Sequence, residues 1–86
     1  MEIKKFNIES VADVKEFFTW LADNSLLIHP DDKFAWFLDF ADEENPSVIT
    51  AEQADDLDNM MEDCFDVCEA EGTDIYDIAL QFGWER

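Results

Sequence analysis

The chain has 86 residues, and its five Lys and Arg stand against 23 Asp and Glu, which gives a formal net charge of −18 at pH 7. Such a chain has no basic surface with which to neutralise phosphates, so direct binding of nucleic acid or of anionic membranes is not expected. Hydrophobic residues make up 48 % of the chain, which argues against wholesale disorder and predicts one domain over residues 1–86.

The first residues predict a short extended segment. Phe6 and Ile8 alternate with polar neighbours at the two-residue period of a β-strand, while Ile3 lies out of phase. A single strand is not stable without a partner, and the β-branched run at residues 47–49 is the best candidate. We therefore expect a minor two-stranded pairing of about residues 3–8 with residues 47–49.

A first helix is expected over residues 10–23. Ser10 is a favourable N-cap residue, and the run that follows it favours a helix. Its apolar positions recur at three- and four-residue steps, as on one face of a helix, and are Val14, Phe17, Phe18 and Leu21. Trp20 stands off this apolar stripe.

A second helix is expected over about residues 32–41. Pro30 suits the start of a helix or the turn before it, and the two aspartates that follow are favoured at the positive end of a helix dipole. The apolar stripe of this helix comprises Phe34, Phe37, Leu38 and Ala41. Trp36 and Phe40 point away from that stripe.

The clearest element is a long helix at about residues 51–71. Thr50 and Gln53 fit a capping box at its start, and Gly72 can adopt the left-handed conformation that ends a helix. Its apolar stripe predicts a buried face and comprises Ala54, Leu57, Met61, Cys64 and Cys68. The two cysteines are therefore expected to be reduced core residues.

A last short helix is expected between Thr73, which can cap it, and Gly83, which stops it; Trp84 follows in the tail. Its buried face comprises Ile75, Ile78, Ala79 and Phe82. Together these elements predict a mainly α fold, a small domain of three or four helices around the long helix.

The long helix also carries an acidic face, opposite its apolar stripe, on which like charges recur at steps of three and four residues. This face comprises Asp55, Asp58, Glu62, Asp66 and Glu69. A run of charge is by itself compatible with two interpretations, a solvated surface and a docking surface for a basic protein. The second interpretation includes imitation of a nucleic-acid backbone.

Aromatic residues outside the predicted stripes form a second candidate set for partner binding. They are Trp20, Trp36, Phe40 and Trp84. A core of this size can wrap around them, or they can form an exposed patch that binds a partner or a second copy of the chain, since Trp side chains concentrate at such interfaces.

No catalytic, cofactor or metal site is predicted. His29 is the one histidine available as a base, and nothing in the sequence places it near Cys64 or Cys68. The same three side chains fall short of the four ligands of a structural zinc site, and no run of carboxylates has the spacing of an EF-hand loop. A small enzyme or metal-binding protein that uses His29 and carboxylates is the least favoured hypothesis.

Four short patterns between about residues 29 and 78 resemble small acidic proteins carried by bacterial conjugative and other mobile elements. The patterns are His29-Pro30-Asp31-Asp32 with Phe34, Thr50-x-Glu52-x-Ala54, Met61-x-x-Cys64-Phe65-x-x-Cys68, and Gly72-x-Asp74-Ile75-Tyr76. The resemblance implies no known activity. It favours an accessory or interfering protein over a metabolic enzyme.

The favoured hypothesis is a non-enzymatic, acidic protein-interaction module that self-associates through its aromatic residues and needs no cofactor. The alternative is an acidic decoy that imitates nucleic acid and binds a basic protein. A cytoplasmic location is expected, because the sequence contains no run of 18 apolar residues and starts without an apolar region of signal-peptide length.

Overall fold

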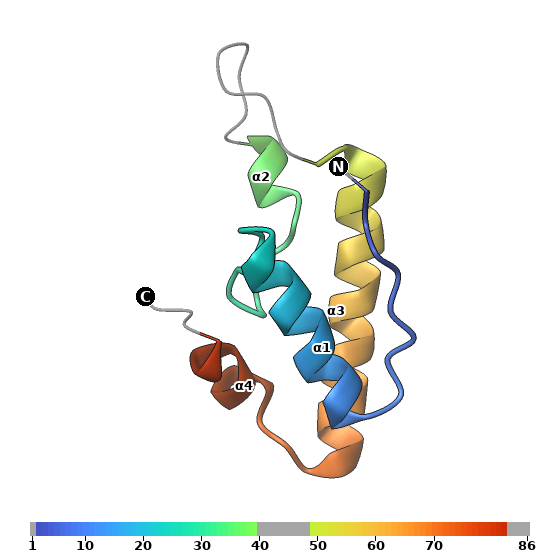
Figure 1. The fold of residues 1–86 in the computed structure, drawn as a ribbon, viewed down its shortest axis with the longest axis vertical. Coiled ribbons are helices and arrows are strands. Elements are labelled where there is room, and N and C mark those ends of the chain that lie inside the picture. Colours follow the sequence, from blue (N-terminus) through green and yellow to red (C-terminus); the bar gives the residue numbers. More distant parts are fainter. Residues whose placement is uncertain (1, 40–48, 83–86) are drawn as a thin grey trace.

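The computed structural model describes residues 2–39 and 49–82, which form four helices (Figure 1). The helices are α1 (Val11–Asp23), α2 (Trp36–Asp39), α3 (Ala51–Glu71) and α4 (Ile75–Gln81). α1 packs against α3 and runs in the opposite direction, and residues 2–9 follow α3 as an extended chain. The predicted mainly α fold around a long helix at residues 51–71 is confirmed.

The two longer helices both start with a capping box. In α1 the Ser10 hydroxyl accepts from the Asp13 N–H, and the Asp13 carboxylate accepts from the Ser10 N–H. In α3 the Thr50 hydroxyl accepts from the Gln53 N–H at 3.1 Å, and the Gln53 side chain accepts from the Thr50 N–H at 2.9 Å. These reciprocal bonds satisfy backbone donors that the first turn of a helix leaves unpaired.

The end of α3 decides where α4 begins. Gly72 adopts a φ of 67°, and the Thr73 N–H donates to the Cys68 carbonyl at 2.8 Å, as in a Schellman motif. Because Thr73 belongs to this reversal, the prediction that it caps the last helix is wrong. The cap is Asp74, whose carboxylate accepts from the Tyr76 N–H at 2.9 Å.

The core lies between α1, α3 and α4. The predicted stripe of α1 is buried throughout, as are Ala54, Leu57, Met61, Cys64 and Cys68 of α3 and Ile75, Ile78 and Ala79 of α4. Both cysteines are reduced. Burial raises the pKa of the Cys64 thiol far above its ordinary value, with smaller contributions from Cys68 and Asp63, so this thiol is an inert core group.

The prediction of a helix over residues 32–41 is wrong about its length. Of residues 32–39, which are the described part of this range, only Trp36–Asp39 is α-helical. Turns occupy the chain before it, and Phe34 is fully buried there. The Phe34 N–H donates to the Asp58 carboxylate at 2.9 Å and so is not used in a helical bond to residue 30. Residues 40–41, at the expected end of this helix, lie outside the described residues.

Residues 3–8 are extended but form no strand with any described residue, so the expected pairing is not observed. Ile49 is described, whereas residues 47–48 are not. Among the described residues, the contacts that hold this segment are made by side chains. Ile8 is buried, and the Phe6 ring packs edge-on against Phe17 with a centroid distance of 5.6 Å.

Candidate protein-binding surface

On the acidic face of α3, carboxylates at the two edges contact other segments of the chain, and those between them are exposed to solvent. On one edge Asp56 pairs with Lys5, at 3.5 Å between Oδ2 and Nζ. On the other edge Asp58 is partly buried and bonds to the Phe34 backbone. The remaining four predicted residues, Asp55, Glu62, Asp66 and Glu69, are all exposed. Asp58 therefore has a structural role, and the other four are accessible.

Charge is distributed unevenly along the sequence. Residues 34–85 hold 16 of the 23 Asp and Glu and contain no Lys, Arg or His. Three of the five cations, Lys4, Lys5 and Lys15, precede residue 16. The carboxylates of α3 and α4 are therefore not compensated by any cation within these two helices.

An aromatic cavity lies beside the turns that precede α2. It has a volume of about 280 Å³ and is lined by Ser25, Leu27, Ile28, His29, Asp32, Trp36 and Phe37. The Trp36 ring stands perpendicular to that of Phe37 at a centroid distance of 5.2 Å, and its side chain is 48 % exposed. Of the two alternatives that the sequence leaves open for Trp36, burial in the core and exposure, the structure shows exposure of a large apolar side chain.

One wall of this cavity is held by His29. Its Nδ1 accepts from the Asp31 N–H at 3.1 Å, and its ring lies 5.4 Å from that of Tyr76 in α4. The Tyr76 hydroxyl in turn donates to Asp31 Oδ1 at 2.6 Å. That hydrogen bond is the main reason that the pKa of Tyr76 is raised. His29 thus packs the turn against α4.

A narrow cleft lies between the turn at residues 30–33 and α3. It has a volume of about 50 Å³ and is lined by Pro30, Asp32, Lys33, Asp58, Met61, Glu62 and Phe65. Asp32 lines both the cleft and the aromatic cavity. The two depressions therefore adjoin at Asp32, and we call the combined area the acidic–aromatic surface: His29, Asp32, Trp36, Phe37, Asp58 and Glu62.

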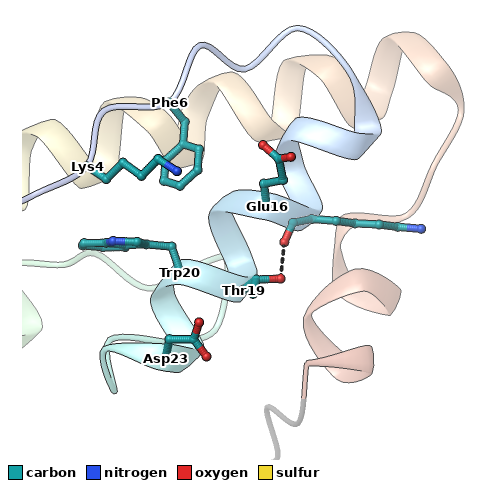
Figure 2. Close-up of a pocket in the computed structure, with 7 residues that line it drawn as sticks. Lys4, Phe6, Glu16, Thr19, Trp20 and Asp23 are labelled. Atoms are coloured by element: carbon teal, nitrogen blue, oxygen red, sulfur yellow. Dashed lines mark hydrogen bonds between the residues drawn. The ribbon is translucent and has the colours of Figure 1, made fainter.

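Trp20 lies in a different place. It borders a groove between residues 2–9 and α1, which has a volume of about 440 Å³ (Figure 2). Its ring lies 6.4 Å from that of Phe6, and the Lys4 ammonium lies 4.9 Å from the centre of the Phe6 ring. The structure therefore separates Trp20 from Trp36. Phe40 and Trp84, the other two aromatic candidates, lie outside the described residues.

Sequence reasoning missed the part played by Asp32 and Phe37. The sequence places Pro30 at the start of a helix or in the turn before it, and it predicts that the helix already begins at about residue 32. The turn exists because Phe34 is drawn into the core and bonded to Asp58, a contact that spans 24 residues. No local pattern reports such a contact.

The described residues contain no group of three or more His, Cys, Asp or Glu side chains arranged to hold a metal ion. Within the same residues no helix is long and apolar enough to cross a bilayer. Comparison with protein-family models, with curated proteins and with solved structures finds no match to this chain. The fold and surface thus define a small, mainly α, acidic protein, and its function must be argued from the surface itself.

Proposed function

We propose that this protein is a non-enzymatic interaction module that binds a basic segment of another protein on its acidic–aromatic surface. The observation that carries the proposal is the position of Trp36, which is 48 % exposed beside a cavity that shares Asp32 with the cleft lined by Glu62. An exposed Trp next to carboxylates suits a partner segment in which an apolar side chain is flanked by Lys or Arg.

The two parts of the surface would contribute differently. A Trp side chain buries about 200 Å² in an interface, so covering the exposed half of Trp36 removes about 100 Å² from water, or about 2.5 kcal/mol. The carboxylates contribute mainly to the rate of association, because a net charge of −18 attracts a basic partner over a distance that salt shortens. Binding should therefore weaken as ionic strength rises.

A nucleic-acid-binding protein is one basic partner that this proposal includes. An acidic decoy would use the exposed centre of the α3 face, namely Asp55, Glu62, Asp66 and Glu69, more than it would use Trp36. This version is compatible with the accessory or interfering role that the resemblance to mobile-element proteins implies. The two versions differ in which variant abolishes binding.

The test begins with affinity capture from the native cell, after which the captured protein is identified and purified. Calorimetry then measures its Kd for the wild type, for Trp36→Ala and for Leu80→Ala. Leu80 is the matched control, because it is a large apolar residue, 58 % exposed, that lines none of these depressions. We expect Trp36→Ala to weaken binding at least about tenfold and Leu80→Ala to leave it unchanged.

The decoy version predicts another pattern. In that case the double variant Asp55→Lys/Asp66→Lys abolishes capture, whereas Trp36→Ala has little effect. If binding instead strengthens with added salt, or if Leu80→Ala weakens it as much as Trp36→Ala does, the proposal of a basic partner on this surface is wrong.

A further inference from the structure

The aromatic cavity beside α2 has the size and walls of a site for a single cationic group. Its volume is about 280 Å³, below the range of about 300–1,000 Å³ usual for drug-sized ligands, so it has room for the end of one side chain. The rings of Trp36 and Phe37 border it and stand at 88° to each other, and the His29 ring borders it as well. The faces of aromatic rings attract cations.

Contacts with the rest of the fold hold two of these rings in place without a ligand. Phe37 stacks on the fully buried Phe34, with 19° between the ring planes and 6.4 Å between the ring centres. Phe34 is tied to α3 by its bond to Asp58, and the His29 ring packs against Tyr76 of α4. Binding in such a cavity costs little ordering of its walls.

The charges around the cavity also favour a cation. Among the described residues that line it, Asp32 is the one acid, and none is Lys or Arg. Lys33 lines the adjoining cleft and not the cavity. His29 Nδ1 accepts the Asp31 N–H and so carries no proton, which leaves this ring neutral. The net charge of −18 attracts a positively charged group from a distance.

The side chains of the cavity indicate which kind of cation fits. A guanidinium has five N–H donors and an ammonium has three, and each donor that is buried without a partner costs free energy. Among the described lining residues, the side chains that can accept such bonds are those of Ser25 and Asp32. A trimethylammonium group has no N–H donor and presents only methyl groups, so aromatic rings and one carboxylate suit it.

We propose, on the basis of the function proposed above, that the cavity binds a methylated ammonium group and that a methylated lysine of the partner protein supplies it. The methyl groups then make the apolar contact with Trp36. The flexible four-carbon stem of lysine carries the group into the cavity while the partner backbone stays on the surface. Basic residues beside it reach Glu62 in the adjoining cleft.

The first test uses choline and its uncharged carbon analogue, in which a tert-butyl group replaces the trimethylammonium group. Each is titrated into isotope-labelled protein at constant ionic strength, and the indole N–H signals are followed by NMR. We expect choline to shift the Trp36 signal, to leave the Trp20 signal in place, and to bind about tenfold more tightly than the analogue. Equal affinities would overturn the proposal.

Two variants locate the effect of charge. Asp32→Asn keeps the shape of the side chain and should weaken choline binding about threefold or more. Asp23→Asn is the matched control, because Asp23 is an exposed acid that lines the separate groove beside Trp20, and it should leave binding unchanged. Equal losses in the two variants would mean that choline responds only to net charge, which overturns the site.

A short basic peptide with one lysine between two arginines tests the source of the group. We expect the trimethyl-lysine form to bind about tenfold more tightly than the unmodified form, and more tightly than choline, because its arginines add contacts with the acidic surface. Choline that binds as tightly as the methylated peptide would show a small-molecule site and overturn the assignment to lysine.

Failure of this proposal differs from failure of the proposed function. A captured partner that needs Trp36 but binds equally with methylated and unmodified lysine overturns the methylated-lysine site and leaves the interaction module supported. Choline binding in the cavity, together with a captured partner that Trp36→Ala does not weaken, overturns the proposed function and the lysine source, while it supports the preference of the cavity for a methylated ammonium group.

Discussion

The carboxylate of Asp58, in the middle of α3, accepts a hydrogen bond from the backbone N–H of Phe34 at 2.9 Å. This bond fixes the turns before α2 against the long helix, with the Phe34 ring fully buried beneath them. It also places Trp36 two residues away from the point of attachment. The acidic helix and the exposed aromatic residue therefore form one surface because of this contact.

Asp58→Ala should destabilise the fold, because it leaves a partly buried N–H unpaired and releases the turn. The expected loss in the free energy of unfolding is about 1–3 kcal/mol, measured by urea denaturation. Asp55→Ala is the matched control on the exposed face, and it should change stability by less than about 0.5 kcal/mol. Equal losses in the two variants would show that the bond to Phe34 is not a stabilising contact.

Thr50→Ala should cost about 1 kcal/mol, because it removes the hydroxyl that accepts the Gln53 N–H in the capping box of α3. Thr19→Ala provides a comparison with the same chemical change. The Thr19 hydroxyl donates to the Lys15 carbonyl within α1, a carbonyl in the helix interior that keeps its helical partner without it. Thermal unfolding should show a lower Tm for the first variant only. A Tm for Thr50→Ala equal to that of the wild type would contradict the importance of this cap.

The bond between Tyr76 and Asp31 predicts an alkaline pH dependence. A raised pKa in the folded state means that the contact contributes to stability at neutral pH and is lost as pH rises through that pKa. Tyr76 is the chain's one tyrosine, so absorbance titration of tyrosinate reports it directly. We expect a pKa above its ordinary value of about 10 and a lower pKa in Asp31→Asn.

Asp77→Asn is the control for this titration, because Asp77 is an exposed acid in the same helix that makes no contact with the Tyr76 hydroxyl. It should leave the pKa of Tyr76 where the wild type has it. If Asp77→Asn lowers the pKa as much as Asp31→Asn does, general negative charge is responsible and the hydrogen bond is not.

The cysteines should be unreactive in the native protein. Burial raises the pKa of both thiols, and the thiolate is the form that reacts with alkylating agents. Alkylation of Cys64 and Cys68 at pH 8, followed by mass spectrometry, should therefore be slow in buffer and rapid in urea. Rapid labelling in buffer would mean that the C-terminal half of α3 opens to solvent.

Much of the fold could be predicted from local patterns. The starts of α1 and α3 and the end of α3 are set by hydrogen bonds between residues at most five positions apart, and their buried stripes follow the helical period. Of the proposed site, the exposure of most of the α3 face follows from the same helical period, and so does the position of Trp36 off the apolar stripe, whereas the sequence left burial and exposure of Trp36 both open. Each of these properties depends on a residue and its near neighbours along the chain.

The remaining features depend on contacts between distant parts of the chain. Because the Phe34 N–H bonds to Asp58, the second helix is shorter than expected. The same bond gives Asp58, which belongs to the predicted acidic face, a structural role. Packing of residues 2–9 on α1 placed Trp20 in a groove separate from the cavity beside Trp36. Capping and periodicity are local properties that the amino-acid sequence determines by itself, whereas the assembly of a surface from separate segments is decided by which side chains meet when the core closes.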